Sequence, residues 1–142
     1  MGKVLGIDFG LKRIGLALTD ELKIIASPFQ TIENKNWSVE LKAIVEQENI
    51  ELFVVGLPKS LNNREIEMTH HVNLFKKSLL LTFPAIPIVL VDERFTSTMA
   101  SQVIIRSGIS KKRRQDKSVT DRVSAAIILQ SYLSTLDISK KS

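Results

Sequence analysis

Short apolar segments separated by polar turns dominate the first third of the chain. Residues 3–9 and 13–18 are two such segments, and Gly10-Leu11-Lys12 between them predicts a β-hairpin with a glycine-bearing turn. A third strand is predicted from Lys23 to Ile32. Pro28 lies inside it and favours an edge strand or a bulge, because proline cannot donate a ladder hydrogen bond.

The apolar pattern changes to helical spacing near residue 36. Trp37, Leu41, Ile44 and Val45 share one face of a helix over about 36–49. Two continuous apolar runs, Leu52–Val55 and Ile88–Val91, are typical of buried parallel strands. Further helices are expected within about 61–81, near 97–107 and from about 119 to 136, with a basic loop over 109–117.

This order of elements predicts an α/β fold for one domain over residues 1–142. Three antiparallel strands come first and parallel strands follow, which gives a five-stranded mixed sheet with helices on both faces. Apolar runs are too short for a membrane span, and charges at Lys3 and Asp8 leave no room for a signal-peptide core. We therefore expect a cytoplasmic protein with no membrane partner.

The net charge of +5 is concentrated in one segment. Residues 106–122 hold seven Lys and Arg residues against two acids, and the remaining 125 residues are balanced. Such a run of basic residues is either a solvated loop or a surface that binds a phosphate backbone. The basic residues expected to contact nucleic acid are Lys12, Arg13, Arg94, Lys111, Lys112, Arg113, Arg114 and Lys117.

Acidic residues at strand and helix ends are the candidates for catalytic or cation-binding roles. Asp8 closes the first apolar strand, where it either caps the turn or, as a buried carboxylate, pairs with a cation. Asp92-Glu93 ends another apolar strand, and side-chain alternation does not choose between the two residues. Asp121 precedes Ala125 by four residues and lies on the apolar stripe of the last helix, although it could instead cap that helix.

Converging carboxylates would form an oxygen-rich site for a hard divalent cation. The chain has no cysteine, and its two histidines, His70 and His71, are expected to point apart on a helix surface, so zinc is not favoured. Mg²⁺ or Mn²⁺ held by carboxylates activates water and stabilises charge on a phosphoryl oxygen. Beside a basic segment, this chemistry predicts hydrolysis of phosphodiester bonds.

Four motifs in order resemble the YqgF/RuvX family over about residues 3–134. They are Gly6-Ile7-Asp8-Phe9-Gly10 with Gly15, Val55-Gly56-Leu57-Pro58, Val91 through Ser97, and Asp121 with Ala125 through Leu133. The resemblance implies a ribonuclease H-like fold, a Mg²⁺- or Mn²⁺-dependent nuclease, and maturation of the 5′ end of 16S rRNA. It also implies catalytic carboxylates at Asp8, at Asp92 or Glu93, and at Asp121. We take Asp8, Glu93 and Asp121 as the metal ligands.

Three other functions are also compatible with these residues. A sugar kinase or actin-type ATPase shares the Asp8-x-Gly10 pattern but needs two such domains. A non-catalytic nucleic-acid-binding module would use residues 106–122 and keep the acids as scaffold. A Holliday junction resolvase would cut branched DNA and need a dimer, whereas RNA end-processing is compatible with a monomer or a weak dimer.

Overall fold

The computed structural model describes residues 2–57, 63–92 and 117–141. Its elements alternate between strands and helices after an all-strand beginning. They are β1 (Lys3–Asp8), β2 (Arg13–Thr19), β3 (Ala26–Glu33), the 3₁₀ turn η1 (Asn34–Asn36), α1 (Trp37–Glu48), β4 (Ile50–Leu57), α2 (Asn63–Thr82), β5 (Ile88–Asp92) and α5 (Lys117–Lys141). The helix predicted near 97–107 lies outside the described residues, and so does the basic loop predicted over 109–117 except for its last residue, Lys117, where α5 begins.

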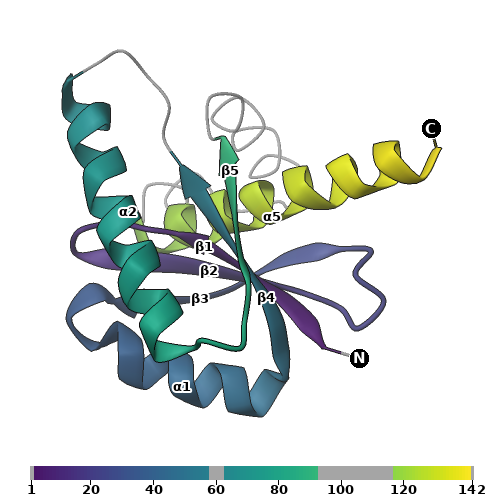
Figure 1. The fold of residues 1–142 in the computed structure, drawn as a ribbon, viewed down its shortest axis with the longest axis horizontal. Coiled ribbons are helices and arrows are strands. Elements are labelled where there is room, and N and C mark those ends of the chain that lie inside the picture. The colour runs from purple at the N-terminus through teal and green to yellow at the C-terminus, as the bar shows by residue number, and fades with distance from the viewer. Residues whose placement is uncertain (1, 58–62, 93–116, 142) are drawn as a thin grey trace.

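The five strands form one mixed sheet in the order β3-β2-β1-β4-β5. β1, β2 and β3 pair antiparallel, whereas β4 and β5 run parallel to β1. α1 and α2 cover one face of the sheet and α5 crosses the other (Figure 1). The predicted α/β architecture, with an antiparallel part, a parallel part and helices on both faces, is confirmed.

Alternating side chains of each strand divide the core into two layers. Leu5 and Ile7 of β1 pack with α1 and α2 in one layer, whereas Val4 packs with Ala125 and Leu129 of α5 in the other. Because successive strand residues face opposite ways, Asp8 faces the same side as Val4, the side of α5.

β3 is an edge strand with a register shift against β2. Leu16 pairs with Gln30, but the next residue, Ala17, pairs with Pro28, so one residue of β3 has no partner position. The edge and the bulge together accommodate Pro28, as its missing N–H requires. Both alternatives predicted for this proline therefore occur together.

β5 was predicted as a buried strand, and that prediction is wrong. All five residues of β5 are only partly buried, because β4 is its only neighbour within the described sheet. β4 itself is central and buried, and it extends to Leu57, two residues beyond the predicted end at Val55.

Helix ends and turns follow local chemistry. Asn49 caps the C-terminus of α1, where its left-handed conformation (φ 54°) is one that asparagine adopts readily. In the turn between β2 and β3, Asp20 accepts hydrogen bonds from the backbone N–H groups of Ile24 (2.9 Å) and Ile25 (3.0 Å). These bonds, the one from Ile25 most strongly, hold the pKa of the Asp20 carboxyl below its ordinary value.

None of the helices, as far as they are described, is long and apolar enough to cross a membrane.

Candidate active site

The turn between β1 and β2 forms one border of the candidate site, and η1 holds it in place. The side-chain amide of Asn34 donates to the carbonyl of Gly10 (2.7 Å), and the backbone N–H of Asn34 donates to the carbonyl of Lys12 (3.0 Å). A Cβ at Gly10 would overlap the backbone carbonyl of Arg13, so only glycine fits this turn. The predicted glycine-bearing turn is confirmed, and Asp8 lies immediately before it.

Asp8 and Asp121 both lie next to Gly15. In the antiparallel ladder Asp8 pairs with Gly15, which places the side-chain directions of both positions on the α5 face, roughly 5 Å apart. α5 lies so close to Gly15 that a Cβ there would overlap the backbone carbonyl of Asp121. Two acids 113 positions apart in the sequence are therefore neighbours at one end of the sheet.

The predicted phase of the last helix explains this approach. Ala125, Ile128 and Leu129 are fully buried against the sheet, as their spacing predicted, and Asp121 lies one turn before Ala125. A second glycine, Gly6, lets α5 approach β1, because a Cβ there would lie 2.9 Å from the carbonyl oxygen of Ala125. Asp121 reaches the site because the helix packs directly on backbone.

Arg13 forms an ion pair with Asp121. Its Nε lies 3.1 Å from Oδ2 of the carboxylate, and the side chains are 38% and 26% exposed. The pair is therefore open to solvent and contributes little to stability, on the order of 0.2–1 kcal/mol. Sequence reasoning placed Arg13 among the contacts to nucleic acid and missed its position beside Asp121.

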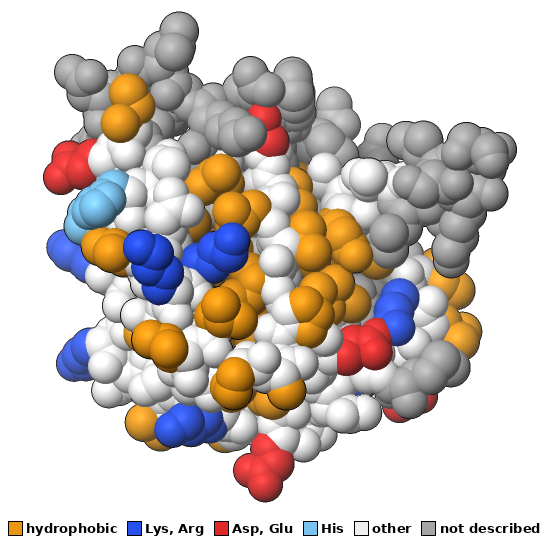
Figure 2. Space-filling view, viewed as in Figure 1, with side chains coloured by type: hydrophobic (Ala, Val, Ile, Leu, Met, Phe, Trp, Pro, Cys, Tyr) orange, Lys and Arg blue, Asp and Glu red, His pale blue; other side chains and the backbone are white. Residues whose placement is uncertain are grey.

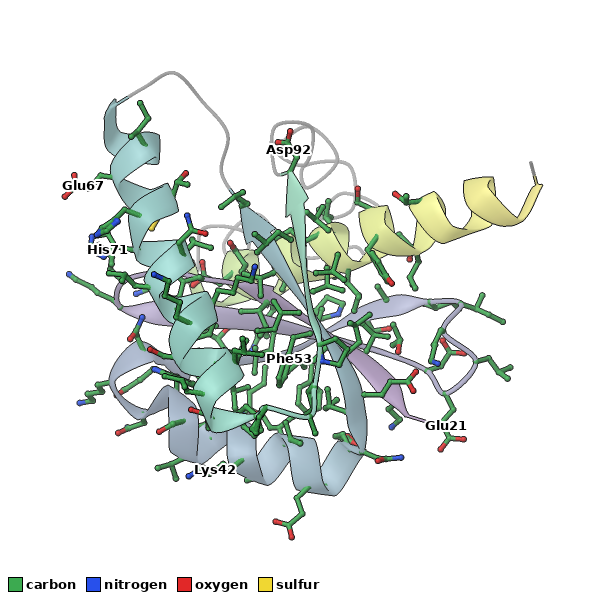
Figure 3. All side chains as sticks on the ribbon, in the orientation of Figure 1. Glu21, Lys42, Phe53, Glu67, His71 and Asp92 are labelled. Atoms are coloured by element: carbon green, nitrogen blue, oxygen red, sulfur yellow. The ribbon has the colours of Figure 1, made fainter. Side chains whose placement is uncertain are left out.

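Asp92 ends β5 (Figure 3), and because β5 runs parallel to β1, Asp92 lies at the same end of the sheet as Asp8, two strands away. Val91 packs in the α5 layer and Leu90 in the opposite one, so alternation directs Asp92 to the face away from α5. Asp92 thus shares the sheet end with Asp8 and Asp121 but not their face. Glu93, its partner in the sequence prediction, lies outside the described residues.

The remaining predicted contacts to nucleic acid are only partly placed. Lys12 is exposed at the tip of the β1–β2 turn, and Lys117 is the first residue of α5. The other five predicted residues lie outside the described part of the chain, and they are Arg94, Lys111, Lys112, Arg113 and Arg114. Of the predicted cations with a described side chain, Lys12 is thus exposed in the turn that follows Asp8.

The two histidines do not both lie on the surface as predicted. His70 is exposed, but His71 is half-buried and lines a pocket, and the two ring centres are only 6.1 Å apart.

Among the side chains that the structure describes, no three acids or histidines cluster closely enough to hold a metal ion.

A family model described as RuvX, Holliday junction resolvase, matches residues 2–135. The chain belongs to this family. Relatives include a protein of Porphyromonas gingivalis that is 47% identical over 96% of this chain and 99% of its own length, and one of Parabacteroides distasonis that is 43% identical over 94% and 95%. Both carry the name "putative pre-16S rRNA nuclease".

Solved structures identify the fold. Thermus thermophilus RuvC in complex with a Holliday junction superposes with a TM-score of 0.59 at 16% identity, covering 90% of this chain and 92% of RuvC. The Fowlpox virus resolvase gives 0.56 at 12% identity, covering 94% and 98%. The expected ribonuclease H-like fold is confirmed by this likeness to the resolvases, together with the mixed five-stranded sheet.

Proposed function

We propose that this RuvX-family chain is a Mg²⁺- or Mn²⁺-dependent nuclease that hydrolyses phosphodiester bonds in the 5′ leader of pre-16S rRNA, in the cytoplasm. One observation carries the proposal. α5 sets Asp121 over Gly15, the ladder partner of Asp8, so two half-buried acids from opposite ends of the chain share one edge of the sheet. The names of relatives at 40–47% identity support RNA as the substrate.

The donors at this edge fit a hard divalent cation. Asp8 and Asp121 offer carboxylate oxygens, and the chain has no cysteine to favour a softer metal. We propose Glu93 as the third ligand, because alternation along β5 directs Asp92 to the other face. A cation held there would activate a water molecule and stabilise negative charge on the phosphoryl oxygens.

The chain's own cations would position the substrate. Lys12 is exposed on the turn that follows Asp8, where its ammonium group can bind a phosphate next to the scissile one. Arg13 offsets the charge of Asp121, which lowers the repulsion between the acids and an approaching phosphate backbone. The basic residues at 111–114 would add phosphate contacts and make binding strongly salt-dependent.

Conservative changes of the two acids test the proposal. Asp8→Asn and Asp121→Asn should each abolish Mn²⁺-dependent cleavage of a pre-16S rRNA fragment while binding to the same RNA is kept. Asp20→Asn is the matched control, because Asp20 lies in the turn at the far end of β2. Wild-type cleavage by both site variants would disprove the carboxylate mechanism. RNA binding without cleavage by the wild-type protein would instead support a non-catalytic binding module.

The third ligand is tested separately. Glu93→Gln should abolish cleavage, whereas Asp92→Asn should retain most of it, since Asp92 faces away from α5. The reverse result would assign the role of third ligand to Asp92. It would also indicate that the end of β5 rotates toward α5 when the substrate or the metal binds.

Cleavage of four-way DNA is a second candidate function, favoured by the family description and by the fold shared with RuvC. Symmetric cleavage of a junction needs two active sites and hence a dimer, whereas trimming of an RNA end needs one. Incubating the protein with Mn²⁺ and each substrate in parallel, with the oligomeric state measured by light scattering, separates the two. Selective cleavage of the junction by a dimer would overturn the assignment to RNA.

A further inference from the structure

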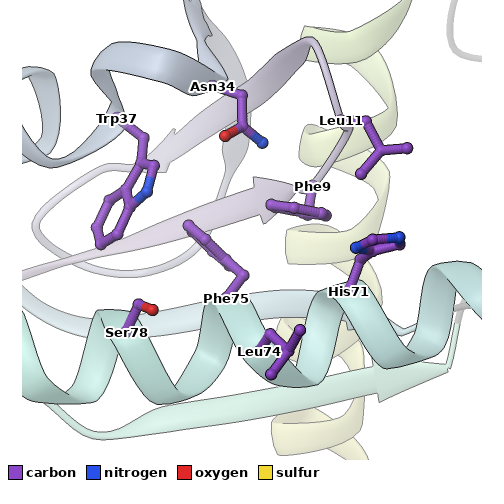
Figure 4. Close-up of a pocket in the computed structure, with 8 residues that line it drawn as sticks. All are labelled: Phe9, Leu11, Asn34, Trp37, His71, Leu74, Phe75 and Ser78. Atoms are coloured by element: carbon purple, nitrogen blue, oxygen red, sulfur yellow. The ribbon is translucent and has the colours of Figure 1, made fainter.

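A pocket of about 260 Å³ opens at the same end of β1, on the face opposite α5. The β1–β2 turn and the start of α1 form one side of it, and α2 forms the other (Figure 4). Its walls include Phe9, Leu11, Asn34, Trp37, His71 and Phe75. Its size is somewhat below the range of about 300–1,000 Å³ that is usual for drug-sized ligands, and so it suits a single small ring system.

Three aromatic rings give the pocket its chemical character. The rings of Phe9 and Phe75 lie 4.8 Å apart at 33°, and Trp37 meets Phe75 edge-on at 5.1 Å. Phe75 is buried, whereas Phe9 and Trp37 keep part of their surface open. Leu11 stands 56% exposed at the rim, where an apolar side chain gains by covering a bound ring.

The polar groups of the pocket suit a heterocycle better than a plain hydrocarbon. The amide nitrogen of Asn34 must face the carbonyl of Gly10, because it donates to it at 2.7 Å. This fixes the orientation of the side chain and leaves Oδ1 as the acceptor that Asn34 can offer to an amino group. On the opposite wall, the half-buried ring of His71 can accept or donate a hydrogen bond.

The position of the pocket relates it to the acid pair. Phe9 directly follows Asp8, so their Cα atoms are about 3.8 Å apart while their side chains point to opposite faces. Lys12 is exposed next to Leu11, and Figure 2 shows Lys and Arg side chains on the same face of the molecule as a histidine side chain. A phosphate chain that passes over the end of β1 could therefore bring one base to the pocket.

We propose that this pocket binds one unpaired nucleobase of a single-stranded segment next to the cleavage position. The inference rests on the proposed function in that the substrate is nucleic acid, but it does not require cleavage. Aromatic faces accept any base by stacking. The acceptor of Asn34 then favours a base with an exocyclic amino group over one without.

Trp37 gives a direct readout, because it is the single tryptophan of the chain and lines the pocket. Without metal, so that no cleavage occurs, a short oligoadenylate should quench its fluorescence. An abasic ribose-phosphate oligomer of equal length should bind through phosphates alone and leave the signal unchanged. Equal quenching by both oligomers, or none by either, would overturn the proposal, and the latter result would fit a protein segment as the occupant instead.

Neighbouring histidines provide matched variants. His71→Ala should weaken oligoadenylate binding about 2- to 10-fold, the usual range for one lost hydrogen bond, whereas His70→Ala should not change it. Leu11→Ala serves as a second variant that does not perturb the core and should also weaken binding, since Leu11 is exposed at the rim. Wild-type affinity in both the His71 and Leu11 variants would disprove the base site.

Failure of this inference is distinguishable from failure of the proposed nuclease. Asp8→Asn and Asp121→Asn should keep the full quenching of Trp37, because their side chains face α5. Quenching without cleavage by the wild-type protein would retain the base site and reject the nuclease. Cleavage without base-dependent quenching would retain the nuclease and reject the base site.

Discussion

Replacing Gly15 with alanine adds one carbon atom where β2 and α5 meet. The new Cβ would overlap the backbone carbonyl of Asp121 and would lie 2.9 Å from the Cβ of that residue. A change of rotamer cannot relieve a clash with backbone, so the start of α5 must move away from β2. Asp121 would then move away from Asp8.

Both the stability and the activity costs can be estimated. Overpacking a close contact costs about 1–3 kcal/mol of unfolding free energy, and a gain of about 0.4–1 kcal/mol from removing a flexible glycine offsets part of it. The net loss is therefore about 0–2.6 kcal/mol, and at about 2–4 °C per kcal/mol the melting temperature should fall by up to roughly 10 °C. A displacement of catalytic groups by about 1 Å can cost about 100-fold in rate, which is the loss we expect for cleavage.

Gly6→Ala is the matched control. Its Cβ would lie 2.8 Å from the Cβ of Leu129 and 2.9 Å from the carbonyl oxygen of Ala125, about 12 Å and about 6 Å further along α5 than Asp121. It should lower the melting temperature by a similar amount, measured by circular dichroism, but reduce Mn²⁺-dependent cleavage far less. An unchanged rate for Gly15→Ala, or an equal loss of activity in both variants, would refute the view that Gly15 sets the position of Asp121.

Three further predictions follow from single contacts. Thr19→Val should cost about 1–3 kcal/mol in chemical denaturation, because the buried Oγ1 of Thr19 accepts the N–H of Val4 at 2.9 Å, and Thr19→Ser should retain most of the stability. Arg13→Gln should change stability by less than about 1 kcal/mol but tighten Mn²⁺ binding several-fold in calorimetry at low salt, by removing a positive charge beside Asp121; unchanged affinity would remove Asp121 from the ligands. Because folding lowers the pKa of Asp20, its contribution is present above its ordinary pKa of 3.8 and is lost as the pH falls through the lower folded value. Asp20→Ala should therefore be less stable than wild type near neutral pH, and urea titrations should show the difference closing in strong acid.

Local patterns in the sequence were sufficient to predict most of the elements. The apolar stripe of α5 placed Asp121 on the sheet-facing side, because helical phase depends only on spacing. Pro28 indicated an edge or a bulge, because its missing N–H is a property of one residue. Strand order is not local, and this is why a continuous apolar run could not distinguish the partly exposed β5 from a buried strand.

Sequence reasoning missed two site features, although one had a readable signal. Gly15 interrupts an otherwise apolar strand, and a glycine inside a strand often marks the close approach of another backbone. The contact between Arg13 and Asp121 had no local signal, since 108 positions separate the two residues and only the packing of α5 brings them together.

The end of β1 links the two proposed sites through strand geometry. Asp8 faces α5 and the acids, whereas Phe9 faces α2 and the aromatic pocket, and the turn held by Asn34 fixes both directions at once. A ligand lying on one face of the sheet could reach only one of these sites. A substrate that uses both must cross the end of the strand, with its phosphates toward α5 and a base turned toward α2. A continuous base-paired duplex presents its bases stacked inward, so this geometry favours a single-stranded or locally opened segment at the point of cleavage.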